Sequence, residues 1–269
     1  PLDQGFHHVV DIVLNTSRLW NAMACCGMLW RSYREASGFA RYRRAFGQPI
    51  GRFANTDAMV AQVFAEACAA TASTLDLVAV DEAGSAPEAV RLGLNMNKYW
   101  TSVRTTQMIR GAMEVIGGNA AIEDFTPLGR LYRDALVTES WEGAHNVLIA
   151  QCWRDMLRLG LHKPWFDWLG RRLAGLADGA ARDQLVQRLQ HLQGDAQALV
   201  ASQDPSDARK ARAFVENAMV AHQGVCLVEL AAKHGAAINP AVVQHFLELH
   251  PHRQPGPSLG WWPERDQLT

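Results

Sequence analysis

The 269-residue sequence has almost no charge asymmetry, since 26 lysines and arginines face 27 aspartates and glutamates, for a formal net charge of −1. Without a one-sided positive field, bulk charge gives no support to non-specific nucleic-acid binding. An uninterrupted apolar run of the roughly 20 residues that a membrane-spanning helix requires is also absent. Residues 1–5 do not have the charged and apolar regions of a secretory signal. We therefore expect a cytoplasmic protein with no membrane contact.

The sequence also lacks the spacings of common metal sites and nucleotide-binding loops. Its five cysteines are odd in number and have no C-x-x-C spacing, which predicts reduced, buried thiols. The ten histidines have no cysteine or carboxylate partner at metal-ligand spacing, so no metal is expected. The patterns G-x-G-x-x-G, P-loop and G-x-S-x-G do not occur.

Helical periodicity dominates what is present. Apolar residues recur at intervals of three, four and seven from residue 12 onward, which indicates a long amphipathic helix that reaches about Arg41. Thr56 or Asp57 can cap a second helix, which ends within residues 81–85. Clear β alternation over long stretches is absent, so we expect an all-α protein.

Two further long helices are expected before residue 160. Ser85-Ala-Pro-Glu has the form of a capping box with proline in the first turn, and the apolar pattern after it continues to Ile116. A short helix near residues 127–133 and a fourth long helix from about Trp141 past Trp153 follow. Four long helices with short links predict an up-down bundle.

The chain is expected to divide into a helical bundle over residues 1–155, a helical extension over 156–250 and a Pro/Trp-containing tail over 251–269. The extension contains helical patterns over residues 165–177, 180–201, 206–234 and 240–249. Because leucine stripes in these helices need a partner surface, we expect the extension to pack on the bundle, with Trp261-Trp262 anchoring the tail.

Four motifs occur in a fixed order along the first 155 residues: Arg18, Arg43-Arg-Ala-Phe-Gly-Gln-Pro-Ile50, Glu114-Val-Ile-Gly-Gly-Asn119, and Arg133-Asp-Ala followed by Ser140-Trp-Glu-Gly143. Together they resemble the C-terminal half of acyl-CoA dehydrogenases, from residue 5 to about 155. The resemblance implies FAD as cofactor and an acyl-CoA substrate. It also implies that an N-terminal half or a partner chain completes the active site, so that this portion alone is inactive.

Glu142 matches the family's catalytic base. The resemblance implies that it removes an α-proton while the flavin accepts a β-hydride, leaving an enoyl-CoA. A neighbouring Trp141 could shield the carboxylate and contact the substrate, and Arg18 matches an arginine close to the base and the acyl-CoA. The residues alone leave two simpler interpretations open: Glu142 in the first turn of a helix, and Arg18 on the surface.

The cofactor residues implied by the resemblance are Arg43, Phe46, Glu114, Gly117 and Gly118. Arg43 would contact the flavin diphosphate of a neighbouring subunit, because a guanidinium fork matches phosphate oxygens. Phe46 would lie against the cofactor, and the glycine pair would let backbone approach a nucleotide. A solvated basic helix end and a simple helix stop are the alternatives.

The sequence departs from the family at three positions, since Glu114, Ala120 and Ala144 replace the usual glutamine, glycine and threonine. An oxidoreductase that forms dimers or tetramers and passes electrons to an electron-transfer flavoprotein is the leading hypothesis. The tryptophan of W-E-G, Glu114 and the extension also resemble the alkylation-response branch, whose members bind FAD and associate with DNA. A structural subunit without FAD is the third hypothesis.

Overall fold

The computed structural model describes residues 5, 9–202, 207–234 and 239–254. The helices, in chain order, are η2 (Val9–Val13, a π-helical turn), α2 (Leu14–Tyr42), α3 (Ala54–Ala83), α4 (Pro87–Ile116), α5 (Leu128–Ser140), α6 (His145–Leu159), α7 (His162–Ala174), α8 (Ala180–Ala201), α9 (Ala208–Lys233) and α10 (Pro240–Leu249). Two 3-10 turns, η3 (Ile50–Arg52) and η4 (Gly117–Ala121), and a hairpin of two-residue strands, β1 (Arg44–Ala45) and β2 (Gln48–Pro49), join them. The predicted all-α fold is confirmed.

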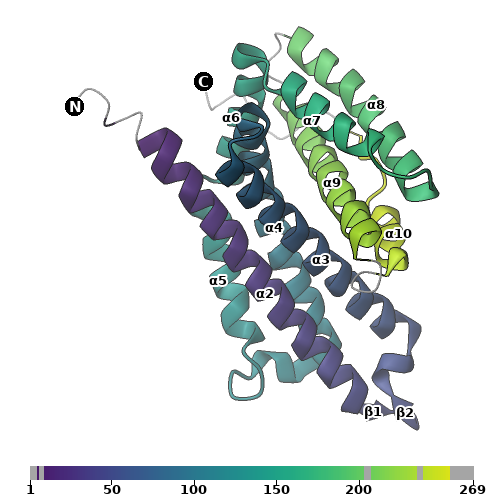
Figure 1. The fold of residues 1–269 in the computed structure, drawn as a ribbon. Helices are drawn as coiled ribbons and strands as arrows, with labels where there is room; N and C mark the ends of the chain where they lie inside the picture. Colours follow the sequence, from purple (N-terminus) through teal and green to yellow (C-terminus); the bar gives the residue numbers. More distant parts are fainter. Residues whose placement is uncertain (1–4, 6–8, 203–206, 235–238, 255–269) are drawn as a thin grey trace, which may run out of the picture.

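Three long helices form the centre of the molecule (Figure 1). Helix α2 runs down to the hairpin, α3 returns and α4 runs down again, so that consecutive helices are antiparallel. Helix α5 packs against α2 and α4, and α6 packs against α4 and α9. The bundle is therefore of the predicted up-down type, with α5 and α6 in succession where one fourth helix was expected.

Two helix starts differ from the sequence prediction. Helix α3 begins at Ala54, so neither Thr56 nor Asp57 caps it. The N-cap residue of α4 is Ala86 rather than Ser85, and the predicted capping box does not form. Burial of the helix sides contributes more to helix stability than a cap does, so a helix can begin without one.

The fourth predicted helix needs the largest correction. The short helix expected near residues 127–133 is the 13-residue helix α5, and α6 begins at His145 rather than at Trp141. Residues 141–144 therefore form a loop between two helices. The interpretation of Glu142 as a carboxylate in the first turn of a helix is wrong.

Helix α3 is long and apolar enough, by composition, to cross a membrane. In the folded chain 61% of its most apolar stretch is buried by other helices. Its Glu66 is 1% exposed and accepts hydrogen bonds from Arg104 of α4 (2.9 Å) and from His250 after α10 (2.7 Å). A buried carboxylate with such partners is typical of a protein core.

Helices α7, α9 and α10 pack on one side of the bundle, against α3 or α4, and α8 packs on the outside against α9 and α7 (Figure 1). One hydrophobic core continues from α3 and α4 through α6 into α7, α8, α9 and α10. The four helical patterns predicted after residue 163 correspond to α7–α10 within a few residues. The predicted anchoring of Trp261-Trp262 lies outside the described residues.

Candidate active site

The loop between α5 and α6 holds Glu142 in a rare backbone conformation. Glu142 has a φ of 61° and Gly143 a φ of 115°, values that residues with a side chain seldom adopt. A Cβ on Gly143 would also lie 3.0 Å from Cδ2 of Leu148. The left-handed conformation of a glutamate costs on the order of 1 kcal/mol, so contacts elsewhere must hold it.

One of these contacts comes from Arg18, which is 5% exposed. Its Nε donates to the backbone carbonyl oxygen of Glu142 (3.2 Å), its Nη2 to Oε1 of Gln151 on α6 (3.1 Å) and its Nη1 to Oδ1 of Asn95 on α4. Burial lowers the pKa of Arg18. The interpretation of Arg18 as a surface residue is wrong, because it joins α2, α4, α6 and the Glu142 loop in the interior.

A second cation, Lys98 of α4, holds the same loop and was not singled out from the sequence. Its side chain is fully buried, and its ammonium donates to the carbonyl oxygens of Glu139 and Gly143, both at 2.9 Å. Burial lowers the pKa of Lys98 to about 8. Little in the sequence marks it, because the stretch from Leu92 to Ser102 mixes apolar and polar residues. Only the structure shows that all of them are buried, so that the charge of Lys98 requires a partner.

The carboxylate of Glu142 itself is half-buried, and among the described residues it makes no hydrogen bond or ion pair. Arg18 and Lys98 lie close to it, but their hydrogen bonds go to backbone carbonyl oxygens and, for Arg18, also to the side chains of Asn95 and Gln151. Both carboxylate oxygens therefore keep lone pairs that can accept a proton.

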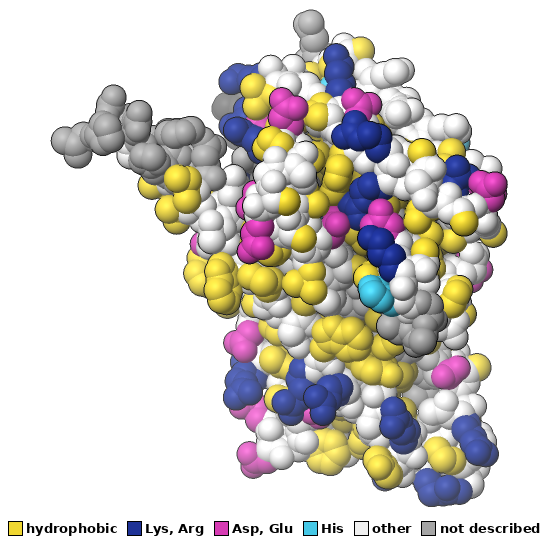
Figure 2. All heavy atoms as spheres, viewed as in Figure 1, with side chains coloured by type: hydrophobic (Ala, Val, Ile, Leu, Met, Phe, Trp, Pro, Cys, Tyr) yellow, Lys and Arg dark blue, Asp and Glu magenta, His cyan; other side chains and the backbone are white. Residues whose placement is uncertain are grey.

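An apolar groove lies beside this loop. It encloses about 640 Å³. The residues that line it come from η2, from the first half of α2, and from the end of α5 and the loop after it. They include Ile12, Val13, Thr16, Trp20, Ala24 and Trp141. Trp20 is 67% and Trp141 61% exposed, and Figure 2 shows apolar side chains gathered over this part of α2. Because Trp141 faces the groove in an exposed position, it does not enclose the Glu142 carboxylate within this chain.

The motif that contains Arg43 and Phe46 forms the hairpin at the other end of α2. Phe46 and Gly47 make its two-residue turn, with φ values of 48° and 84°, the combination found in type I′ turns. Phe46 is 96% exposed. Arg43 is exposed as well, and no carboxylate in the described part of the chain pairs with it. The motif thus presents an aromatic ring and a free guanidinium to the outside.

Glu114, Gly117 and Gly118 lie at the end of α4, at the same end of the bundle as the hairpin. Glu114 is exposed, with its carboxylate 4.0 Å from Arg110. Gly117 ends the helix with a φ of 72°, and added Cβ atoms on either glycine would meet nothing within 4 Å. The glycine pair does end the helix, and its backbone is open to a ligand.

The two groups of candidate residues do not meet within one chain. Arg18 is near the start of α2 and Arg43 follows its last residue. At about 1.5 Å per residue, the 25 residues between them span roughly 37 Å. The structure brings Arg18, Trp141 and Glu142 together at one end, and Arg43, Phe46, Glu114, Gly117 and Gly118 at the other.

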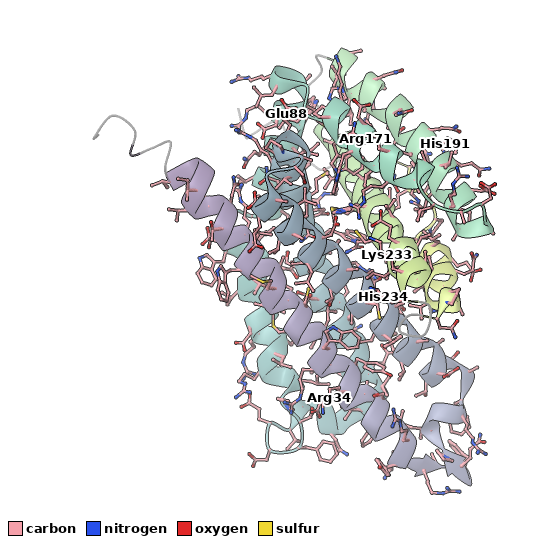
Figure 3. The ribbon with its side chains drawn as sticks, viewed as in Figure 1. Arg34, Glu88, Arg171, His191, Lys233 and His234 are labelled. Carbon is pink, nitrogen blue, oxygen red and sulfur yellow. The ribbon has the colours of Figure 1, made fainter. Side chains whose placement is uncertain are left out.

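A separate ionic cluster joins α3 to α7 and α9. Arg172 donates two hydrogen bonds to Asp76 (2.8 and 3.0 Å) and two to Glu229 (2.9 and 2.7 Å). Asp76, His222 and Cys226 are close enough together to suggest a metal site. The guanidinium already occupies the cation position, since it also lies 3.6 Å from Sγ of Cys226. Figure 3 labels Lys233 at the end of α9, the helix that packs against α3.

Comparisons with known proteins agree with the motif order. The family model of the acyl-CoA dehydrogenase C-terminal domain matches residues 3–157. Acyl-CoA dehydrogenase family member 11 of Caenorhabditis elegans is 29% identical over 146 residues, which are 52% of this chain and 24% of that protein.

Two solved structures share the fold over the bundle and the extension. The ACDH-11 structure from Caenorhabditis elegans in complex with C11-CoA has a TM-score of 0.72 at 22% identity, covering 92% of this chain and 44% of that one. The acyl-CoA dehydrogenase of Bacillus anthracis complexed with FAD has a TM-score of 0.71 at 17% identity, covering 90% and 46%. The chain spans less than half the length of these relatives.

Proposed function

This chain belongs to the acyl-CoA dehydrogenase family, whose C-terminal domain it contains, and we propose that it is the base-carrying part of an FAD-dependent enzyme that oxidises acyl-CoA thioesters. Family membership supports a dehydrogenase-like oxidoreductase. In the proposed reaction Glu142 removes the α-proton of the acyl group. The flavin, when bound, accepts the β-hydride, and an enoyl-CoA results.

The conformation of Glu142 carries the proposal. Two buried cations hold its loop: Arg18 binds the carbonyl oxygen of Glu142, and Lys98 binds the carbonyl oxygens of Glu139 and Gly143. The carboxylate of the left-handed residue Glu142 has no bonding partner in the described chain. Strained backbone that the surroundings maintain is concentrated at functional sites. A glutamate with only a structural role would gain nothing from such a loop, whereas a base needs a fixed position and free lone pairs.

The residues at the hairpin end fit a nucleotide cofactor on three counts. Arg43 is an exposed cation without an anionic partner in the described residues, as a diphosphate site requires. Phe46 exposes a whole aromatic face beside it, and the backbone at Gly117 and Gly118 is open. Glu114 is the unfavourable group, and Arg110 offsets part of its charge. Arg43 and Phe46 would hold the diphosphate and a ring of FAD.

The length of α2 supports an arrangement with two copies of the chain. Because roughly 37 Å separate the two groups of candidate residues, one chain cannot direct both at the same reacting carbon. We propose that the Arg43 end of one copy serves the Glu142 end of another, within a dimer or a dimer of dimers. Electron transfer to an electron-transfer flavoprotein and a cytoplasmic location remain proposals that rest on the family resemblance and on composition.

The groove beside Glu142 is the proposed place of the acyl chain. It is almost entirely apolar, and its lining includes Trp141, Trp20 and Ile12. An acyl chain in this groove would bring the thioester end next to Glu142. The groove would exclude water from that end only when the rest of the protein covers it, since Trp20 and Trp141 are largely exposed here.

The test is Glu142→Gln in the full-length protein. Glutamine keeps the shape of the side chain but cannot accept the proton, so flavin reduction by a reactive acyl-CoA should fall roughly 10²-fold or more. FAD content should stay nearly unchanged, whereas Arg43→Ala should lower FAD content first. If the Glu142→Gln protein reduces its flavin as fast as the parent, the base lies elsewhere and the proposal is wrong.

A further inference from the structure

Lys98 is a buried cation whose position is not explained by packing. It is fully buried on α4, and in the described chain no carboxylate forms an ion pair with its ammonium. Burying a charged lysine costs free energy that an apolar side chain of similar length would not cost. The two carbonyl oxygens that it contacts therefore point to the reason for its presence.

Those oxygens belong to Glu139 and Gly143, which lie on either side of Glu142. Glu139 is in the last turn of α5, where carbonyl groups have no partner within the helix and the helix dipole favours a cation. Gly143 is the residue with a φ of 115° directly after the glutamate. One ammonium thus fixes both ends of the segment, and Arg18 fixes its middle through the Glu142 carbonyl oxygen.

The titratable groups around Lys98 come from α2, α5, α6 and the Glu142 loop. The groups are Cys25 and Arg18 on α2, Glu139 on α5, Glu142 in the loop and His145 on α6. Burial raises the pKa of Cys25 to about 11 and lowers the pKa of His145 to about 4, so both are neutral at pH 7. Arg18 and Lys98 therefore provide the positive charge that faces Glu139 and Glu142.

We propose that Lys98 is a positioning residue for the base: it holds the Glu142 loop in its left-handed conformation, and its charge strengthens both hydrogen bonds to that loop. The proposal rests on the proposed function of Glu142. It assigns Lys98 no contact with substrate or cofactor, and it predicts two separable effects. Loss of the hydrogen bonds should misplace the carboxylate, and loss of the charge alone should weaken the bonds and misplace the carboxylate to a smaller extent.

Three substitutions in the full-length protein separate these effects. Lys98→Met removes both the bonds and the charge, and Lys98→Gln keeps an N–H donor without the charge. Lys98→Arg keeps the charge. Ser102→Ala is the matched control, because Ser102 is a fully buried residue of the same helix whose hydroxyl, among the described residues, donates only to the Tyr99 carbonyl oxygen.

The measurements are FAD content and the kcat and KM of flavin reduction by an acyl-CoA. Lys98→Met should lower kcat roughly 10- to 100-fold, because small displacements of a catalytic group have effects of this size. KM and FAD content should change less than about twofold if the role is confined to the base. The loss of kcat should be smaller in Lys98→Gln and smallest in Lys98→Arg, and Ser102→Ala should keep the kcat of the parent.

Two results would overturn the inference in different ways. If Lys98→Met, or Lys98→Gln where the methionine variant does not fold, keeps the kcat of the parent while Glu142→Gln is inactive, then Lys98 is structural and the proposed function stands. If Glu142→Gln is as active as the parent, the proposed function and the role of Lys98 are both wrong.

Discussion

The Lys98 ammonium lies 2.9 Å from the carbonyl oxygen of Gly143, in the interior of the bundle and next to the loop that carries Glu142. A fully buried lysine and a glycine with positive φ are each unfavourable features when taken alone. Together they stabilise one loop conformation, because the lysine gains two carbonyl acceptors and the glycine permits the turn that presents them. The following predictions depend on this region and on the ion pairs of the core.

The first prediction concerns stability at alkaline pH. The pKa of Lys98 is about 8 in the folded chain, below the ordinary value of 10.5. Between these values the unfolded chain binds the proton and the folded chain does not, so the parent should gain stability relative to Lys98→Met as pH rises from 8 to 10.5. Melting temperatures of both proteins across this range measure the difference. If the melting temperatures of the two proteins change in parallel over this range, burial does not lower the pKa of Lys98.

Gly143→Ala should destabilise the chain by about 1–3 kcal/mol, because alanine is strained in this backbone conformation and its Cβ would also crowd Leu148. Gly170→Ala is a suitable control, since Gly170 lies inside α7 with nothing within 4 Å of an added Cβ. It should stabilise the chain slightly, as expected for alanine within a helix. The urea midpoints of the two variants should therefore shift in opposite directions from that of the parent. Equal shifts of the two midpoints would contradict the prediction.

Acid stability should depend on Glu66. Burial alone would raise the pKa of this carboxyl, but Arg104 and His250 more than offset that effect and hold the pKa at about 2, below the ordinary 4.5. The ionised carboxylate therefore contributes stability above pH 4.5, and this contribution is lost as pH falls from 4.5 to 2.

Glu66→Gln removes that titration and leaves Arg104 buried without its carboxylate partner. At pH 7 the variant should be less stable by about 3–5 kcal/mol, the usual effect of breaking a buried ion pair. Its urea midpoint should then fall less than that of the parent between pH 4.5 and 2. If the difference in urea midpoint between the two proteins stays constant from pH 4.5 to 2, the loss of stability in acid does not come from protonation of Glu66.

Arg43→Ala and Glu142→Gln should complement each other in mixed oligomers. Each variant alone should have low activity in the full-length protein, since every site lacks one of the two residues. If Arg43 of one copy serves the Glu142 end of another, a mixed dimer contains one site with both residues intact, and co-refolding should restore activity to well above that of either variant.

The control for this experiment is a mixture of two proteins that both carry Glu142→Gln, which should stay inactive. Light scattering on the parent should show a dimer or a tetramer. A monomeric parent, or mixed oligomers that form without recovery of activity, would place Arg43 and Glu142 in unrelated sites.

Local patterns were enough to predict most of the helices. The periodicity of apolar residues predicted the bounds of α2 and α4 within a few residues, because apolar residues recur about every 3.6 residues along a helix that buries one side. Caps were a weaker guide: Thr56 and Ser85 are good capping residues, and neither caps a helix here. The stretch at Trp141 was predicted as helix although Gly143 offered a signal for a turn. The order of the motifs led to Arg18, Arg43 and Glu142 because such order is a property of the chain itself.

What the sequence alone determined is therefore the set of helices, the family resemblance and the identity of the candidate base. The tertiary structure decided how that base is held. Arg18 contacts Glu142 across 124 positions of sequence, and Lys98 contacts Glu139 and Gly143 across 41 and 45. A periodic pattern shows which face of each helix is buried, but hydrogen bonds over such separations depend on how α2, α4 and α5 are rotated and placed against one another. That placement results from the packing of the whole core, and no single segment of the chain specifies it.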